Sequence, residues 1–144
     1  MKLAYLACPY THENAPVRES RSATATDYAA RMTARMAVFS PITQGPQIAQ
    51  YLRPSITQHH KFWMDQCIPI LRVCTDLYVL PLNGWRESKG VQEEIEIARL
   101  LLMPIIFIQS EEIELELISE EECVARDWAT EWFGRKPTKM AKVA

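Results

Sequence analysis

The sequence predicts an α/β fold whose core is an open, mostly parallel sheet of about five strands with helices on both faces. Short apolar runs alternate with longer amphipathic segments, which is the pattern of strands separated by crossover helices. The apolar runs contain few polar residues, as is typical of strands buried on both faces. No internal repeat or linker divides the 144 residues, a length that fits one domain. The nearest architectures are flavodoxin-like and Rossmann-like, in which ligands bind at the carboxyl ends of the strands.

The first half of the chain predicts two strands and two helical segments. Residues 2–8 form a compact apolar run that Pro9 ends, which indicates a buried strand. Residues 16–36 begin with a proline and contain few β-branched residues, so they predict an amphipathic helix. Residues 37–40 predict a second short strand, and residues 47–52 predict one or two helical turns.

The middle of the chain contains the clearest strand and helix signals. A second long helix is expected over residues 55–73, broken or kinked at Pro69. Residues 76–82 read DLYVLPL, the best strand pattern in the chain, and a turn follows at residues 83–85. Residues 88–102 begin with a serine in the position of an N-cap and predict a helix.

The last part of the chain is expected to complete the sheet. Residues 105–108 predict a strand, and residues 111–116 alternate in polarity like an edge strand. A final helix is expected from Ser119, and it carries Trp128 and Trp132 four residues apart. We therefore expect one domain over residues 1–134, followed by a basic tail over residues 135–144 that is more typical of a solvated chain end than of a binding arm.

The composition excludes several classes of partner. Sixteen basic and eighteen acidic residues give a formal net charge of -2, which gives no electrostatic reason to expect binding to a nucleic-acid backbone, since that needs a basic face. Nothing near the start resembles a signal peptide. The longest apolar stretch, residues 100–108, contains Pro104 and is too short to cross a bilayer. We expect a cytoplasmic protein that binds neither nucleic acid nor membrane.

The cysteines and histidines show no metal-binding pattern. The four cysteines are scattered without C-x-x-C spacing, so buried free thiols are expected rather than disulfides or a zinc site. The three histidines also lack partner spacing, and His59 and His60 are expected on an exposed helix face. We therefore expect no metal and no cofactor.

Polar residues follow three of the predicted strands. Residues 8–12, 41–45 and 83–88 are expected around one crevice, because the carboxyl ends of parallel strands meet at one edge of a sheet. The loop after Leu82 and the start of the next helix form a candidate anion site, with free N–H groups and the positive end of the helix dipole. Its candidate binding residues are Gly84, Trp85, Arg86, Ser88 and Gly90. The alternative is that Ser88 only caps the helix and Gly90 only packs it on the sheet.

Glu94 is the carboxylate nearest the buried stripe of the helix over residues 88–102. Val91, Ile95 and Ala98 have the spacing of that stripe, and Glu94 lies on a turn beside them. A carboxylate held there is partly desolvated and suits a nucleophile. The alternative is an ordinary solvated acidic face.

Four further residues are candidates for the same site. Tyr5 lies in the first strand, where it either packs or holds a carboxylate through its hydroxyl, and Tyr10 is placed to stack on a ring at the crevice rim. Asp65 has neighbours that look buried, which suits an acid or a hydroxyl-binding group, although an ordinary salt bridge fits equally well. Asp76 opens the third strand and is most simply a turn residue.

Three segments together resemble the nucleoside 2-deoxyribosyltransferase-like superfamily. They are residues 5–11, YLACPYT, residues 74–80, CTDLYVL, and residues 88–98, SKGVQEEIEIA. The resemblance covers roughly residues 3–108. The opening segment and the Gly-Trp-x-x-Ser-x-Gly-Val turn look closest to a bacterial branch described only as a domain of unknown function.

The resemblance implies an N-glycosidic-bond enzyme, either a deoxyribosyltransferase or a hydrolase. The glutamate matching Glu94 would attack the anomeric carbon of a 2′-deoxynucleoside or its 5′-monophosphate, and the tyrosine matching Tyr5 would orient it. The serine matching Ser88 would help bind a 5′-phosphate, which favours a nucleotide, and Asp76 would belong to the substrate-binding residues. Relatives assemble as dimers or larger, so a homo-oligomer, a dimer or a tetramer, is expected.

Two positions depart from the superfamily pattern. The relatives have an aspartate about two turns before the residue matching Asp76, where this chain has Ile68. Asp65 lies a turn earlier and is the candidate for the second, base-protonating carboxylate. Glu96 replaces a small residue. These departures leave a non-catalytic nucleotide-binding or sensing module as the alternative function, and a contact face formed by two tryptophans, 128 and 132, as a third.

Overall fold

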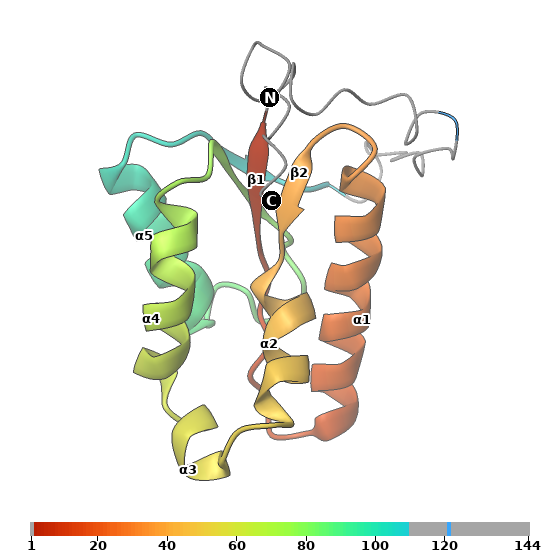
Figure 1. The fold of residues 1–144 in the computed structure, drawn as a ribbon, viewed down its shortest axis with the longest axis vertical. Coiled ribbons are helices and arrows are strands. Elements are labelled where there is room, and N and C mark those ends of the chain that lie inside the picture. The colour runs from red at the N-terminus through yellow and green to blue at the C-terminus, as the bar shows by residue number, and fades with distance from the viewer. Residues whose placement is uncertain (1, 110–120, 122–144) are drawn as a thin grey trace, which may run out of the picture.

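Strands and helices alternate along the described part of the chain (Figure 1). The computed structural model describes residues 2–109 and 121. Its elements are β1 (Leu3–Ala7), α1 (Ala15–Met32), β2 (Ala37–Phe39), α2 (Pro41–Ala49), α3 (Pro54–Thr57), α4 (His60–Leu71), β3 (Asp76–Val79), α5 (Lys89–Leu100) and β4 (Ile105–Phe107). The expected edge strand over residues 111–116, the helix from residue 119 and the basic tail lie outside the described residues.

The four described strands form one open, all-parallel sheet in the order β2-β1-β3-β4. Tyr5 of β1 pairs with Phe39 of β2 and Leu77 of β3, and Leu77 pairs in turn with Ile105 of β4. The predicted fold class is confirmed, and the architecture is consistent with a flavodoxin-like or Rossmann-like sheet.

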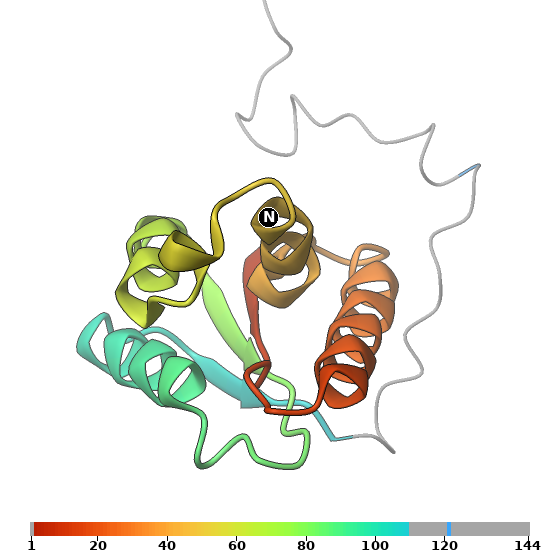
Figure 2. The same ribbon diagram turned by 90° about the horizontal axis from the view of Figure 1, so that it is seen from below.

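The central strand β1 is buried on both faces. Ala4, Tyr5, Leu6 and Ala7 are fully buried, and successive side chains alternate between the two faces of the sheet. Tyr5 and Ala7 belong to the core cluster beneath α4 and α5, whereas Ala4 and Leu6 belong to the cluster beneath α1. Figure 2 shows α1 on one side of the sheet and α4 with α5 on the other. The register of β1 therefore directs the Tyr5 side chain toward α5.

Helix α1 has the predicted buried face but a shorter span. Tyr28, Ala29 and Met32 face the sheet, as expected, together with Met36. The helix ends at Met32, and Met36 lies in the following turn, where its N–H donates to the Met32 carbonyl at 3.2 Å. The apolar spacing thus predicts the buried face of the helix better than its end.

The helical turns predicted over residues 47–52 are instead the end of a longer helix. Helix α2 begins at Pro41, because proline at the first helical position has the required φ and no N–H to leave unpaired. Pro46 lies inside the helix and leaves the Ile42 carbonyl without its intrahelical donor. The Ser22 hydroxyl donates to that carbonyl at 3.0 Å, so the interior proline is tolerated.

The long helix predicted over residues 55–73 breaks at a different place. It is two helices, α3 and α4, separated at residues 58–59, and Pro69 lies inside α4 without ending it. The Trp63 Nε1–H donates to the Thr57 carbonyl at 2.8 Å, so this carbonyl at the end of α3 is used by a side chain. Of the two alternatives, a break at Pro69 is wrong, and a kink there stays a prediction.

Two compositional expectations can be compared with the described residues. Cys8, Cys67 and Cys74 are free and buried, as expected, while Cys123 lies outside the described residues. None of the described helices is long and apolar enough to span a membrane.

Candidate active site

A crevice of about 700 Å³ lies at the carboxyl ends of the strands. The segments after β1, β2 and β3 all contribute to it, as the parallel arrangement predicts, and α4 closes the remaining side. The lining from these segments includes Cys8, Tyr10 and Thr11 after β1, Pro41, Ile42 and Gly45 after β2, and Glu87, Ser88 and Lys89 after β3. Its volume is within the range of small-molecule sites.

Glu94 is a buried carboxyl group in the wall of this crevice. It lies on α5 beside the buried residues Val91, Ile95 and Ala98, and its exposed fraction is 6%. The Tyr5 hydroxyl donates a hydrogen bond to Glu94 Oε1 at 2.5 Å. Because β1 points Tyr5 at this face of α5, the strand holds the carboxyl group in a single orientation.

Burial sets the protonation states of this pair. Desolvation raises the pKa of Glu94 to about 8; the hydrogen bond from Tyr5 opposes the rise, and the charge of Glu93 adds to it. Burial, and then the neighbouring Glu94 charge, raise the pKa of Tyr5 far above its usual range, so Tyr5 remains a neutral donor. Most of the Glu94 carboxyl is therefore protonated at neutral pH and ionises in mildly alkaline solution or when a cationic group approaches.

Two buried thiols flank the pair, and the sequence did not single them out. Burial raises the pKa of Cys8 to about 12, although Arg21 lowers it. Burial also raises the pKa of Cys67, whose thiol is in hydrogen-bonding contact with the Tyr5 hydroxyl. Thiols of this kind are neutral and inert at physiological pH. They serve as small apolar walls of the crevice rather than as nucleophiles.

The start of α5 supplies the polar end of the crevice. Ser88 caps the helix, with its Oγ accepting from the Val91 N–H at 3.4 Å, and it also lines the crevice beside Lys89 and Gly90. The two interpretations of Ser88, as a cap and as a site residue, are thus compatible. A helix N-terminus with a hydroxyl and an ammonium group beside it is suited to an anion.

The preceding loop contains three of the residues predicted to bind substrate. Gly84, Trp85 and Arg86 do not line the crevice. The Trp85 ring packs against Phe107 with centroids 5.3 Å apart, and the Arg86 guanidinium lies 4.8 Å from the Trp85 ring centroid. These contacts fix the loop to β4 just before the start of α5, and the predicted role of the three residues in substrate binding stays a prediction.

Arg21 links the two loops that border the crevice. It donates to the carbonyls of Tyr10 at 3.3 Å and Thr11 at 2.9 Å, and to the carbonyl of Asn83 at 2.8 Å. Gly84 follows at φ 91°, and a Cβ there would lie 2.8 Å from an Arg21 nitrogen. Sequence reasoning missed Arg21, because the helical pattern does not reveal which distant carbonyls an arginine will reach.

The two candidate aspartates lie away from the crevice. The Asp65 side chain is 57% exposed and pairs with Lys61 on the same helix at 2.6 Å, which is the ordinary salt bridge that was the alternative. Asp76 is the first residue of β3, at the opposite edge of the sheet, where it contacts Lys2 at 3.6 Å and accepts from the Thr75 hydroxyl at 2.7 Å. The structure does not bring either carboxylate to Glu94.

His60 was expected on an exposed face but instead lines the crevice. Its Nε2 lies 2.8 Å from Glu93 Oε2, so the first residue of α4 is joined to the second turn of α5. Sequence reasoning missed this pair because its members are 33 residues apart and belong to different helices. Within the part of the chain that the structure describes, no cluster of three histidine, cysteine, aspartate or glutamate side chains could hold a metal ion.

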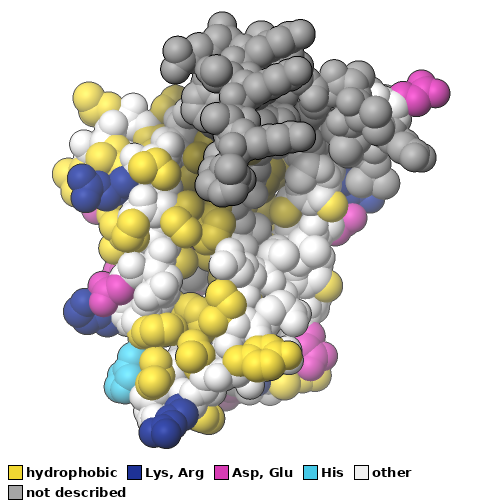
Figure 3. Space-filling view, in the orientation of Figure 1, with side chains coloured by type: hydrophobic (Ala, Val, Ile, Leu, Met, Phe, Trp, Pro, Cys, Tyr) yellow, Lys and Arg dark blue, Asp and Glu magenta, His cyan; other side chains and the backbone are white. Residues whose placement is uncertain are grey.

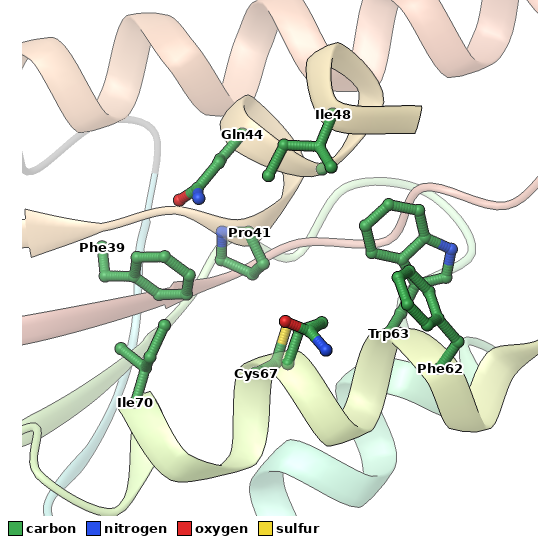
Figure 4. A pocket seen from close by; sticks show the side chains of 10 residues that line it. Phe39, Pro41, Gln44, Ile48, Phe62, Trp63, Cys67 and Ile70 are labelled. Atoms are coloured by element: carbon green, nitrogen blue, oxygen red, sulfur yellow. The ribbon is translucent and has the colours of Figure 1, made fainter. Parts of the chain in front are cut away.

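An apolar side cavity adjoins the crevice. Hydrophobic side chains gather over α2 and α4 in Figure 3, and a cavity of about 110 Å³ lies between these helices. In Figure 4, Phe39 and Ile70 lie at one end of it, and Phe62 and Trp63 lie at the other. Four residues line both spaces and form the wall between them: Pro41, Gly45, Trp63 and Cys67.

The fold and this site define a class of protein, an open parallel α/β domain with a buried carboxyl group in a ligand-sized crevice at the carboxyl edge of its sheet. The chain belongs to the family described as Domain of unknown function (DUF1937), whose model matches residues 2–110. That range includes all four described strands and every residue of the crevice. No curated protein matches the chain.

Proposed function

We propose that the protein cleaves or transfers the N-glycosidic bond of 2′-deoxynucleosides or their 5′-monophosphates. The observation that carries this proposal is the buried hydrogen bond of 2.5 Å between the Tyr5 hydroxyl and Glu94 Oε1 in the wall of the crevice. It is supported by the resemblance of residues 5–11, 74–80 and 88–98 to the nucleoside 2-deoxyribosyltransferase-like superfamily.

The chemistry requires only the residues of the site. An ionised Glu94 oxygen forms a bond to the anomeric carbon, and the bond from that carbon to the base nitrogen breaks with its electron pair on the base. Water or a second base then attacks the same carbon and releases Glu94. Two displacements through a covalent intermediate are easier than one difficult displacement, as in the retaining glycosidases. Tyr5 holds the attacking oxygen in position throughout.

The dimensions and polarity of the crevice suit a nucleotide. The start of α5, with Ser88 and Lys89, is the end where a 5′-phosphate would bind. The wall formed by α2 and α4, with Pro41, Ile42 and Trp63, is apolar and matches the face of a base. This division favours a nucleoside monophosphate over a free nucleoside.

The test measures, by chromatography, the free base released from each of the four common deoxynucleoside 5′-monophosphates. We expect turnover by the wild-type protein and none above background by Glu94→Ala. The matched control is Glu96→Gln on the same helix, because the Glu96 side chain is 64% exposed and contacts only Arg99 among the described residues, at 3.7 Å. Base release by Glu94→Ala at the wild-type rate would contradict the nucleophile.

A non-catalytic nucleotide-binding or sensing module is the second candidate function. Two observations favour it: Asp65 is not at the crevice, and burial raises the pKa of Glu94 to about 8, which disfavours the ionised form. Nucleotide binding that persists in Glu94→Ala, with no base release by the wild type, would support this function over the first.

We also propose that the protein is a homo-oligomer, either a dimer or a tetramer, on the same resemblance. Light scattering after size-exclusion chromatography measures the assembled mass directly. A mass of one chain, 16.6 kDa, at the concentrations of the activity assay would contradict this expectation.

A further inference from the structure

The proposed reaction leaves one proton unassigned. A nucleobase is a poor leaving group until a ring nitrogen or oxygen is protonated, so an acid is needed beside it. Asp65 does not supply this proton, because its carboxylate lies outside the crevice and pairs with Lys61. Tyr5 does not supply it either, because its only hydroxyl proton is donated to Glu94.

Two titratable side chains line the crevice from α4, the helix facing α5: the buried Cys67 thiol, whose pKa is raised by burial, and His60. It is the first residue of α4, and its side chain is 35% exposed. Its ring lies against the first turn of α5, since the Cε1 atom is 3.8 Å from the position of a Cβ built on Gly90. An imidazole in this position is open to the crevice and also held by the wall of the site.

Glu93 holds the His60 ring from one side. Its Oε2 lies 2.8 Å from His60 Nε2, while its Oε1 lies 4.0 Å from Lys89 Nζ. Within residues 2–109, Nδ1 of His60 has no hydrogen-bond partner. A carboxylate on Nε2 orients the ring and keeps a proton on that nitrogen, so in the doubly protonated imidazolium the Nδ1 proton is the one that can pass to a ligand.

The helical repeat explains why Glu93 and Glu94 have different environments. Successive residues on α5 are about 100° apart. Glu94 therefore points into the sheet side of the crevice, where it meets Tyr5, and Glu93 points toward α4, where it meets His60. The two neighbouring carboxyl groups therefore differ: Glu94 is buried and lines the crevice, whereas Glu93 lies outside the lining and is paired with His60, which does line it.

We propose that His60 is the acid that protonates the departing base and that Glu93 is its positioning residue, an assignment that rests on the proposed function. In the first step, Glu94 bonds to the anomeric carbon as the base leaves with its electron pair. The His60 Nδ1 proton passes to that base, and His60 becomes neutral. In the second step, water attacks the anomeric carbon, its proton returns to Nδ1, and Glu94 leaves as a carboxylate.

The test uses the dependence of rate on the leaving group. One substrate is the deoxynucleoside 5′-monophosphate that the wild type cleaves fastest. The other is the 2′-deoxy analogue of nicotinamide mononucleotide, here called the pyridinium substrate, whose base departs as neutral nicotinamide and needs no proton. The variants are His60→Gln and Glu93→Gln. The control is His59→Gln, since His59 is exposed and makes no side-chain cap for α4.

We expect His60→Gln to lower kcat/KM for the natural substrate by about 10²- to 10⁴-fold, the usual contribution of a general acid. The rate on the pyridinium substrate should stay near that of the wild type, which also shows that the variant is folded. Glu93→Gln should lower kcat/KM for the natural substrate by a smaller factor and should likewise spare the pyridinium substrate. His59→Gln should leave the rate on both substrates unchanged.

Three results would overturn the assignment, and they can be told apart. If His60→Gln releases base from the natural substrate at the wild-type rate, or if kcat/KM falls equally on both substrates, the role of His60 is refuted while the proposed function still stands. Equal losses would indicate that the pair only joins α4 to α5. No release from any substrate by the wild type would refute the proposed function and this assignment with it.

Discussion

The buried carboxyl group of Glu94 should make the protein less stable as the pH rises, and Glu94→Gln should remove this effect. The pKa of Glu94 is raised from 4.5 to about 8 in the folded protein. Between pH 4.5 and about 8, the folded protein therefore keeps a proton on Glu94 that the unfolded chain has already released. The stabilisation that such a group contributes is complete below its pKa in the unfolded state. It is lost as the pH rises through its pKa in the folded state.

The magnitude follows from the two pKa values. Each tenfold difference in acid dissociation between the folded and unfolded states corresponds to about 1.4 kcal/mol. Between pH 5 and pH 8, the free energy of unfolding should fall by on the order of 3 to 4 kcal/mol because of this group. Glutamine is uncharged and of similar shape, so the variant should lose less stability over the same interval.

The assay is urea unfolding of wild type and Glu94→Gln at several pH values from 5 to 8, followed by circular dichroism. The quantity of interest is the difference in unfolding free energy between the two proteins, because contributions from other groups largely cancel in it. Glu96→Gln provides the control, since Glu96 is exposed and should give a difference that does not vary with pH. A constant difference for Glu94→Gln would refute the burial argument and the raised pKa of Glu94.

Three further outcomes are expected. With the pyridinium substrate, kcat/KM should rise with pH and level off above about 8, because Glu94 must lose its proton to attack; a rate that falls from pH 6 to 8 would contradict this. Tyr5→Phe removes a hydrogen bond that lowers the pKa of Glu94, so the midpoint of that pH profile should move to higher pH. Gly84→Ala should lower the free energy of unfolding by at least about 1 to 2 kcal/mol in urea titrations, because the residue has φ 91° and a Cβ would lie 2.8 Å from Arg21. The control Gly90→Ala has only a 3.8 Å contact and should not destabilise the protein.

Helix α5 shows how far local pattern can predict a site. Ser88 has the chemistry of an N-cap, and Val91, Ile95 and Ala98 have the spacing of a buried stripe, so the start of the helix and its inward face were predictable. The placement of Glu94 beside that stripe followed from the same spacing. These features depend on residues within a few positions of one another, where the helical repeat alone determines geometry.

The second helical region shows where local pattern fails. The aromatic neighbours of Asp65 suggested burial, but its side chain points to solvent and pairs with Lys61. Pro69 suggested a break, but α4 continues through it, and the helical region is divided at residues 58–59 instead, where the Trp63 side chain donates to the Thr57 carbonyl. Both errors concern contacts that a helix makes only when the chain is packed. The helix propensities of the individual residues do not predict such contacts.

The sequence by itself determined the class of fold, the buried strand β1, and the helix that carries Glu94, because each depends on short-range periodicity. Only the tertiary structure decided which groups meet in the crevice. Tyr5 reaches Glu94 because β1 turns the Tyr5 side chain to the face of the sheet that α5 covers. His60 reaches Glu93 because α4 lies against α5. Contacts between residues far apart in the chain depend on the packing of whole elements, and no local pattern specifies them.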